Sequence, residues 1–78
     1  IFQMKYMFEF LYDNGVKETI KTAKLKSEEV ISITNAIYNS FRKGRDGVIY
    51  FNDDRGSVNY ISLRKITRFN WWEANEED

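Results

Sequence analysis

The chain has 78 residues, the size of one small domain, and it contains neither cysteine nor histidine. These absences exclude disulfide frameworks, thiolate nucleophiles, the usual zinc sites and the commonest general base. Twelve basic and twelve acidic residues give a formal net charge of zero. The lack of cysteine fits a reducing compartment, so we expect a cytoplasmic protein. No apolar run approaches the ~18 residues of a membrane span, so we expect no membrane partner.

The first stretch, residues 4–12, alternates between two kinds of side chain. Its even-numbered positions are all large and apolar or aromatic, namely Met4, Tyr6, Phe8, Phe10 and Tyr12. A period of two with aromatic residues predicts a strand, and residues 16–23 read as a second strand after the turn signal at residues 13–15. A two-residue turn would place lysines on the aromatic face. We therefore prefer a three-residue loop with Gly15 left-handed, which pairs Phe8 with Ile20 but sets Glu18 opposite Phe10.

Residues 27–44 carry the strongest helix signal. Ser27 is a suitable N-cap, Gly44 is a suitable left-handed residue after the last turn, and the charges at both ends complement the helix dipole. A stripe at spacings of three and four is expected to face the sheet, and it consists of Val30, Ile33, Ile37 and Phe41. Ile31 and Tyr38 lie one heptad apart on a flank of this stripe. They either pack against the sheet margin or form an apolar patch for a partner.

Short aromatic and β-branched runs follow the helix and alternate with turn residues. They predict strands at residues 48–52, 57–62 and 66–72, with a hairpin loop between the first two and a bulge or tight turn at residues 63–65. The order ββαβββ predicts an α+β fold in which a single helix packs on one face of an antiparallel sheet, with the second half as a meander. We expect one domain over residues 1–72 and a disordered acidic tail over residues 73–78.

Few residues in this chain suggest catalysis. The closest approach to a carboxylate cluster is Asp53-Asp54, with Asp46 as a third candidate. An Asp-rich loop closed by glycine is what a hairpin turn requires, so we predict a turn there and no metal site. No glycine-rich phosphate loop occurs, and we expect no cofactor and no enzymatic activity. An enzyme that uses carboxylates, Lys, Tyr or Ser stays as an alternative.

Basic residues fall into three groups, which are Lys17, Lys21, Lys24 and Lys26, then Arg42, Lys43 and Arg45, and finally Arg64, Lys65 and Arg68. The last group leads into Trp71 and Trp72. Adjacent strand residues point to opposite faces, so we expect Trp71 in the core with Phe69, and Trp72 on the outer face with Arg68 and Asn70.

Exposed aromatics beside arginine are typical of contact surfaces. The sequence therefore predicts a small non-enzymatic protein-interaction module, with a protein partner or a second copy of itself. The candidate contact residues are Arg64, Lys65, Arg68, Trp72, Ile31 and Tyr38. The alternative is a nucleic-acid-binding domain that uses the basic groups and strand aromatics. Basic groups that converge on one face with an outward Trp would favour this alternative.

Overall fold

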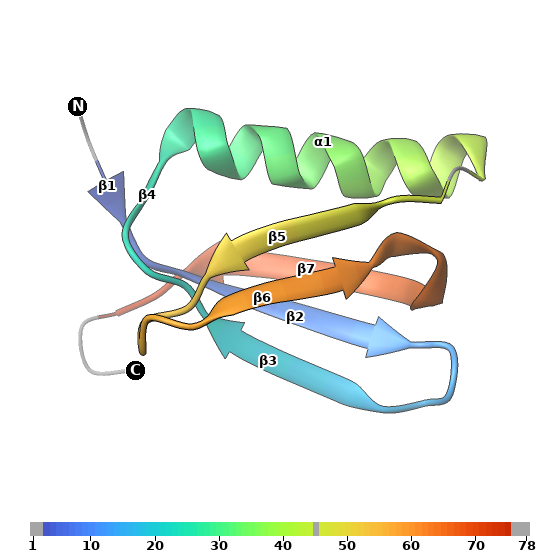
Figure 1. Cartoon of the computed structure of the whole chain (residues 1–78), viewed down its shortest axis with the longest axis horizontal. Helices are drawn as coiled ribbons and strands as arrows, with labels where there is room; N and C mark the ends of the chain where they lie inside the picture. Colours follow the sequence, from blue (N-terminus) through green and yellow to red (C-terminus); the bar gives the residue numbers. More distant parts are fainter. Residues whose placement is uncertain (1–2, 45, 76–78) are drawn as a thin grey trace.

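A computed structural model describes residues 3–44 and 46–75 of the chain (Figure 1). In chain order, the elements are β1 (Gln3–Met4), β2 (Tyr6–Tyr12), β3 (Lys17–Lys21), β4 (Leu25–Lys26), α1 (Ser27–Lys43), β5 (Val48–Asn52), β6 (Val58–Ser62), the 3-10 turn η1 (Leu63–Lys65) and β7 (Ile66–Glu73). The helix packs against antiparallel strands, which confirms the predicted α+β class. The strands predicted from alternation are present, and the two-residue strands β1 and β4 are additional.

The strands form two layers instead of one sheet. β3, β2 and β7 make a three-stranded antiparallel sheet in that order, β5 and β6 make a hairpin, and β1 pairs with β4. Figure 1 shows the hairpin in front of the three-stranded sheet, with α1 along the top and antiparallel to β5. The predicted meander is wrong, because β7 pairs with β2 and not with β6. The turn η1, anchored by the buried Leu63, carries the chain from one layer to the other.

The register of the first hairpin agrees with the three-residue loop. Phe8 pairs with Ile20, the Tyr12 N–H donates to the Val16 carbonyl at 2.9 Å, and Gly15 is left-handed with φ 86°. Glu18 does lie opposite Phe10, yet it is exposed because β3 is an edge strand. Its carboxylate accepts a hydrogen bond from the Tyr12 hydroxyl at 2.5 Å. This hydrogen bond gives the Glu18 carboxylate a partner, so the charge is tolerated opposite Phe10.

The core lies between the two layers and beneath α1. Phe8 and Phe10 are fully buried, and the hairpin contributes Phe51, whose ring meets Phe8 edge-on with centroids 5.1 Å apart. The layers join at a corner where the Ala23 N–H donates to the Asn52 carbonyl at 2.9 Å. Thr22 is fully buried at this corner, and its hydroxyl accepts from the Tyr6 N–H and donates to the Ala23 carbonyl. A buried polar side chain is tolerated there because both hydrogen bonds are made.

The buried face of α1 differs from the predicted stripe at its last position. Val30, Ile37 and Ser40 are buried and Ile33 is half-buried, whereas Phe41 is 48% exposed. Ser40 lies three residues after Ile37 and continues the direction of the buried face, while Phe41 turns toward the flank that carries Tyr38. The small Ser40 side chain satisfies its hydroxyl on the Ile37 carbonyl at 2.8 Å.

Both ends of α1 are capped, although the first cap differs from the prediction. The helix begins at Ser27, so Lys26 is the N-cap residue, and the Glu29 carboxylate accepts from the Lys26 N–H at 2.9 Å. Gly44 is left-handed with φ 63° and donates its N–H to the Ser40 carbonyl, as predicted. No helix in the described part of the chain has the length and apolar character needed to cross a membrane.

The last strand extends one residue beyond the predicted range. β7 continues through Glu73, and the Ala74 N–H donates to the Lys5 carbonyl at 3.0 Å. The backbone of residues 73 and 74, which the sequence assigned to the acidic tail, is therefore paired, and residues 76–78 of that tail lie outside the described residues.

Candidate binding surfaces

The outer face of the β3–β2–β7 sheet brings part of the predicted site together. This surface, called here the charged face, has three cross-strand rows, which are Lys21–Met7–Trp72, Thr19–Glu9–Asn70 and Lys17–Leu11–Arg68. Three bases and one acid therefore share the face with Trp72. The Asn70 amide donates to the central Glu9 carboxylate at 3.2 Å. Arg68 and Trp72 lie on the same face as Asn70, as the alternation predicted.

Trp71 and Trp72 do lie on opposite faces of β7, but neither is buried. Trp71 is on the core side, where its ring meets Tyr6 edge-on with centroids 5.7 Å apart, yet 46% of it stays exposed. Trp72 is 43% exposed on the charged face, beside Met7 of β2. The expectation that Trp71 enters the core is therefore wrong, because Trp71 lies near the end of β7, which is an edge strand of its sheet.

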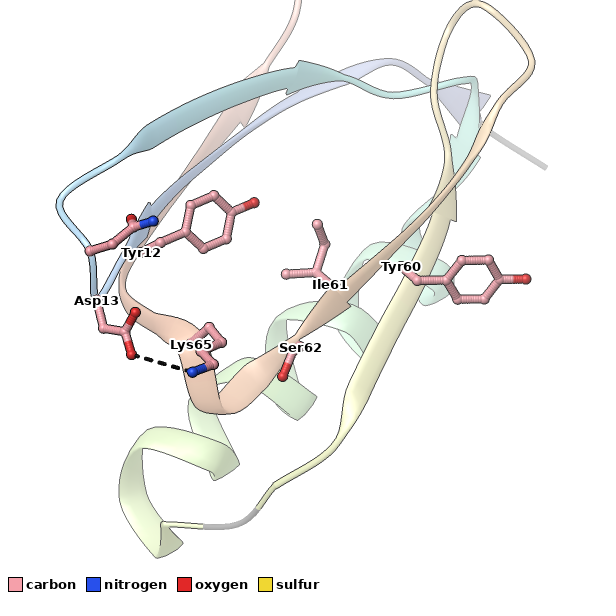
Figure 2. Close-up of a pocket in the computed structure, with 7 residues that line it drawn as sticks. Tyr12, Asp13, Tyr60, Ile61, Ser62 and Lys65 are labelled. Carbon is pink, nitrogen blue, oxygen red and sulfur yellow. Dashed lines mark ion pairs between the residues drawn. The ribbon is translucent and has the colours of Figure 1, made fainter.

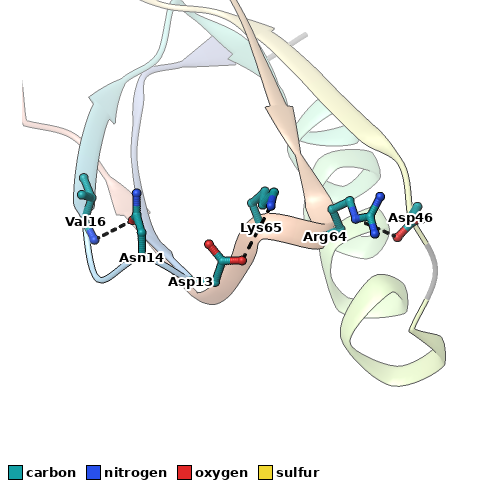
Figure 3. Close-up of polar contacts among 6 residues, drawn as sticks. All are labelled: Asp13, Asn14, Val16, Asp46, Arg64 and Lys65. Atoms are coloured by element: carbon teal, nitrogen blue, oxygen red, sulfur yellow. Dashed lines mark hydrogen bonds and ion pairs between the residues drawn. The ribbon is translucent and has the colours of Figure 1, made fainter.

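Arg64 and Lys65 are separated from Arg68 in space. They belong to η1, where Arg64 faces Asp46 at 3.8 Å and Lys65 faces Asp13 at 4.0 Å (Figure 3). All four side chains are more than half exposed, so each pair contributes little to stability. Of the third basic group, only Arg68 joins the charged face.

Ile31 and Tyr38 lie on α1 and are each 57% exposed. Phe41 extends the same flank of the helix. The Arg42 guanidinium carbon lies 5.8 Å from the centroid of the Tyr38 ring, a cation–π distance. Of the second basic group, Arg42 is therefore engaged at the end of the helix, neither Arg42 nor Lys43 lies on the charged face, and Arg45 lies outside the described residues.

The most exposed large apolar side chains belong to a surface that sequence reasoning missed. The outer face of the β5–β6 hairpin, called here the hairpin face, consists of Val48, Tyr50, Asn52, Val58, Tyr60 and Ser62. Tyr50 and Tyr60 face each other across the two strands with ring centroids 6.1 Å apart, and they are 68% and 71% exposed. None of the six residues is charged. The same period-two alternation that predicted both strands contained this signal.

A groove of about 400 Å³ separates α1 from β5. Ile33 and Ala36 line it from the helix, Val48 and Tyr50 line it from the strand, and Glu28, Glu29 and Ser32 stand at its helical rim. The groove is thus continuous with the hairpin face through Val48 and Tyr50. Two carboxylates and no basic side chain line it.

A second hollow of about 480 Å³ lies between β6 and the turn that joins β2 to β3. Figure 2 shows Tyr12 and Ile61 within this opening and Tyr60 directed away from it. The Asp13–Lys65 ion pair stands at its rim. Burial and the Glu18 contact raise the pKa of Tyr12 above its usual range, so this hydroxyl stays protonated and does not act as a base near neutral pH.

The aspartates of the β5–β6 loop serve the turn. The Asp53 carboxylate accepts from the Asn59 amide and from the backbone N–H groups of Ser57 and Arg55. These bonds, the Asn59 contact first, lower the pKa of Asp53 because they favour its charged form. Among the described residues, no group of three or more acidic side chains has metal-binding geometry.

Comparison with protein-family models, curated proteins and solved structures finds no match to this chain.

Proposed function

We propose that this chain is a small non-enzymatic protein-interaction module that contacts its partner through the hairpin face. The observation that carries the proposal is the row of Val48, Tyr50, Val58 and Tyr60, all 48–71% exposed on two paired strands. Contiguous exposed apolar surface on a small domain is typical of interaction sites.

The composition of the hairpin face supports a protein partner. Because the hairpin face holds no charge, removing it from water on binding costs little free energy. The polar atoms of its two tyrosines are at the tips of rigid rings. Tyrosines are enriched at protein interfaces for this reason. Asn52 and Ser62 supply neutral hydrogen-bonding groups at the margins of the same face.

The test compares the wild-type protein with the double variant Tyr50→Ser/Tyr60→Ser in affinity capture from cells that express it. The variant Tyr38→Ser/Phe41→Ser is the matched control, since it removes two exposed aromatics from α1 instead. We expect the control to retain the wild-type partner and the hairpin variant to lose it, with both proteins folded. Light scattering across a concentration series identifies a second copy as the partner. A hairpin variant that keeps its partners and its solution mass overturns the proposal.

A second candidate function is binding of single-stranded nucleic acid by the charged face. The observation in its favour is that Lys17, Lys21 and Arg68 flank one sheet surface that also carries the outward Trp72. Bases can stack on such a ring while cations contact phosphates. Glu9 at the centre of the face and the single exposed aromatic make this candidate the weaker one.

Fluorescence anisotropy with a labelled oligothymidylate tests this second function. Lys17→Gln should reduce the slope of log affinity against log salt by roughly 0.7 if Lys17 contacts a phosphate. Arg64→Gln is the control, because Arg64 faces Asp46 away from this surface. No binding at low salt removes nucleic acid as a partner.

A further inference from the structure

The hydrogen-bonding pattern of the hairpin identifies the free backbone groups of β5. The Leu63 N–H donates to the Gly47 carbonyl and the Asp53 N–H donates to the Ser57 carbonyl, each at 2.9 Å. Hydrogen-bonded pairs alternate along an antiparallel ladder, so the pairs Ile49–Ile61 and Phe51–Asn59 are also bonded. The N–H and C=O groups of Val48, Tyr50 and Asn52 must then point away from β6.

The free edge of β5 is occupied only at its end. The Asn52 carbonyl accepts from the Ala23 N–H, which confirms the direction of these groups. Within the described residues, β5 pairs with no strand but β6, and no turn or loop hydrogen bond reaches Val48 or Tyr50. Each of these residues therefore presents one unpaired donor and one unpaired acceptor. Their edge lies on the groove that separates β5 from α1.

We propose that this groove binds an extended peptide segment of a partner protein, which adds to β5 as a third strand. The inference depends on the proposed function and gives its mode of binding. The peptide would bond through its main chain to Val48 and Tyr50 and pack alternate apolar side chains against Ile33 and Ala36. Strand addition to an exposed edge beside a helix is an established mode of peptide recognition.

The charge of the groove selects a basic peptide. Glu28 and Glu29 stand at its rim, and α1 runs antiparallel to β5, so the first turn of the helix lies beside the end of β5 (Figure 1). Two carboxylates outweigh the roughly half positive charge of the helix N-terminus. A Lys or Arg next to the apolar positions of the peptide therefore meets negative potential there.

A folded second copy fits this groove poorly. The free edge of β5 in a second copy carries its own α1, so edge-to-edge pairing would bring two helices into one groove. The free edge of β6 is the other open edge of the hairpin, but its neighbouring hollow has an internally paired rim, Asp13 with Lys65. The β5 groove offers unpaired backbone and a lining that includes two carboxylates and no base.

The probe is a displayed library of random eight-residue peptides selected on the whole chain. We expect enriched sequences that alternate apolar residues with others and carry Lys or Arg. Enrichment of acidic sequences, or of none, overturns the groove inference. Glu28→Gln should weaken the selected peptides most at low salt, with the distant Glu73→Gln as its control.

Two variants of Tyr50 form a matched pair for the selected peptides. Tyr50→Pro removes both the side chain and the N–H from the free edge of β5, whereas Tyr50→Ser removes the same side chain and keeps the N–H. Loss of one backbone hydrogen bond predicts about tenfold weaker binding by Tyr50→Pro than by Tyr50→Ser. Ala36→Arg fills the groove from the helix side, leaves the sequence of β5 unchanged, and should also weaken binding about tenfold or more.

The outcomes separate this inference from the proposed function. Weaker peptide binding by Tyr50→Pro than by Tyr50→Ser, together with loss of binding by Ala36→Arg, supports strand addition. Equal binding by Tyr50→Pro and Tyr50→Ser, with Ala36→Arg unaffected, overturns strand addition and leaves the hairpin face as the contact surface. A wild-type dimer that Ala36→Arg makes monomeric assigns the groove to a second copy and overturns the peptide. The serine variants of the hairpin face test the proposed function independently.

Discussion

The charged face and the hairpin face arise from the same alternation but differ in character. Nine outward residues on β3, β2 and β7 include three bases and one acid, whereas six outward residues on β5 and β6 include no charge. On the charged face, Met7 and Leu11 are half-buried. On the hairpin face, Tyr50 and Tyr60 are the most exposed large hydrophobic side chains among the described residues. Outward residues alone therefore do not define an interaction surface.

The two faces differ in the free energy of removing them from water. Lys and Arg cover apolar neighbours with their aliphatic stems while their charges stay in water, so the charged face is adequately solvated without a partner. The hairpin face has no such cover, and burying it removes apolar area from water at about 25 cal/mol per Å². The comparison predicts that a protein partner prefers the hairpin face and that only a polyanion prefers the charged face.

The largest expected difference in unfolding free energy is between a residue on the buried side of the β5–β6 hairpin and its neighbour on the exposed side. Phe51→Ala should cost about 3–5 kcal/mol of unfolding free energy, because Phe51 is buried against Phe8 and Phe10. The adjacent Tyr50→Ala should cost at most about 0.5 kcal/mol, because Tyr50 faces outward. Denaturant melts measure both, and equal losses would show that the hairpin face is not free surface.

The two tryptophans of β7 test whether the charged face is separate from the core. Trp71→Ala should cost about 1–2 kcal/mol, because its ring packs edge-on against the buried Tyr6. Trp72→Ala should cost only about 0.2–1 kcal/mol, the usual range for a cross-strand pair such as Trp72–Met7. Thermal melts of the isolated variants rank them, and the reverse order would place Trp72 in the structural core.

The hairpin face exists only while the β5–β6 loop is formed, and Asp53 holds that loop. Its pKa is lowered in the folded state, so its contribution to stability is present above the ordinary aspartate pKa and is lost as pH falls through the lowered value. Asp53→Asn should therefore be less stable than wild type at neutral pH, with the difference shrinking as the pH falls below the ordinary aspartate pKa. A difference that does not vary with pH would contradict this role.

The smallest effects are expected for surface charges. Arg68→Ala and Arg64→Ala should each change stability by no more than about 0.5 kcal/mol, since both side chains are exposed. If Arg68→Ala proves clearly destabilising in a denaturant melt, the charged face is a structural network and not a surface open to anions.

Local physics explains what could be predicted from the sequence. Period-two alternation identified the strands, Gly15 determined the first hairpin register, and Gly44 determined the end of α1, because each depends on neighbouring residues. The outward position of Trp72 with Arg68 followed from the same alternation. Ser27 was only one residue from the observed cap.

Only the tertiary structure decided how these elements meet. The pairing of β7 with β2 and the position of Arg64 and Lys65 off the charged face depend on the path of η1 between the layers. The exposure of Phe41 and Trp71 depends on which parts of α1 and β7 other elements cover. The groove beside β5 likewise requires that α1, and no strand, lies next to that edge. Alternation specifies which face of a strand a residue occupies, but long-range packing of the whole chain determines which edges and faces remain open to a partner.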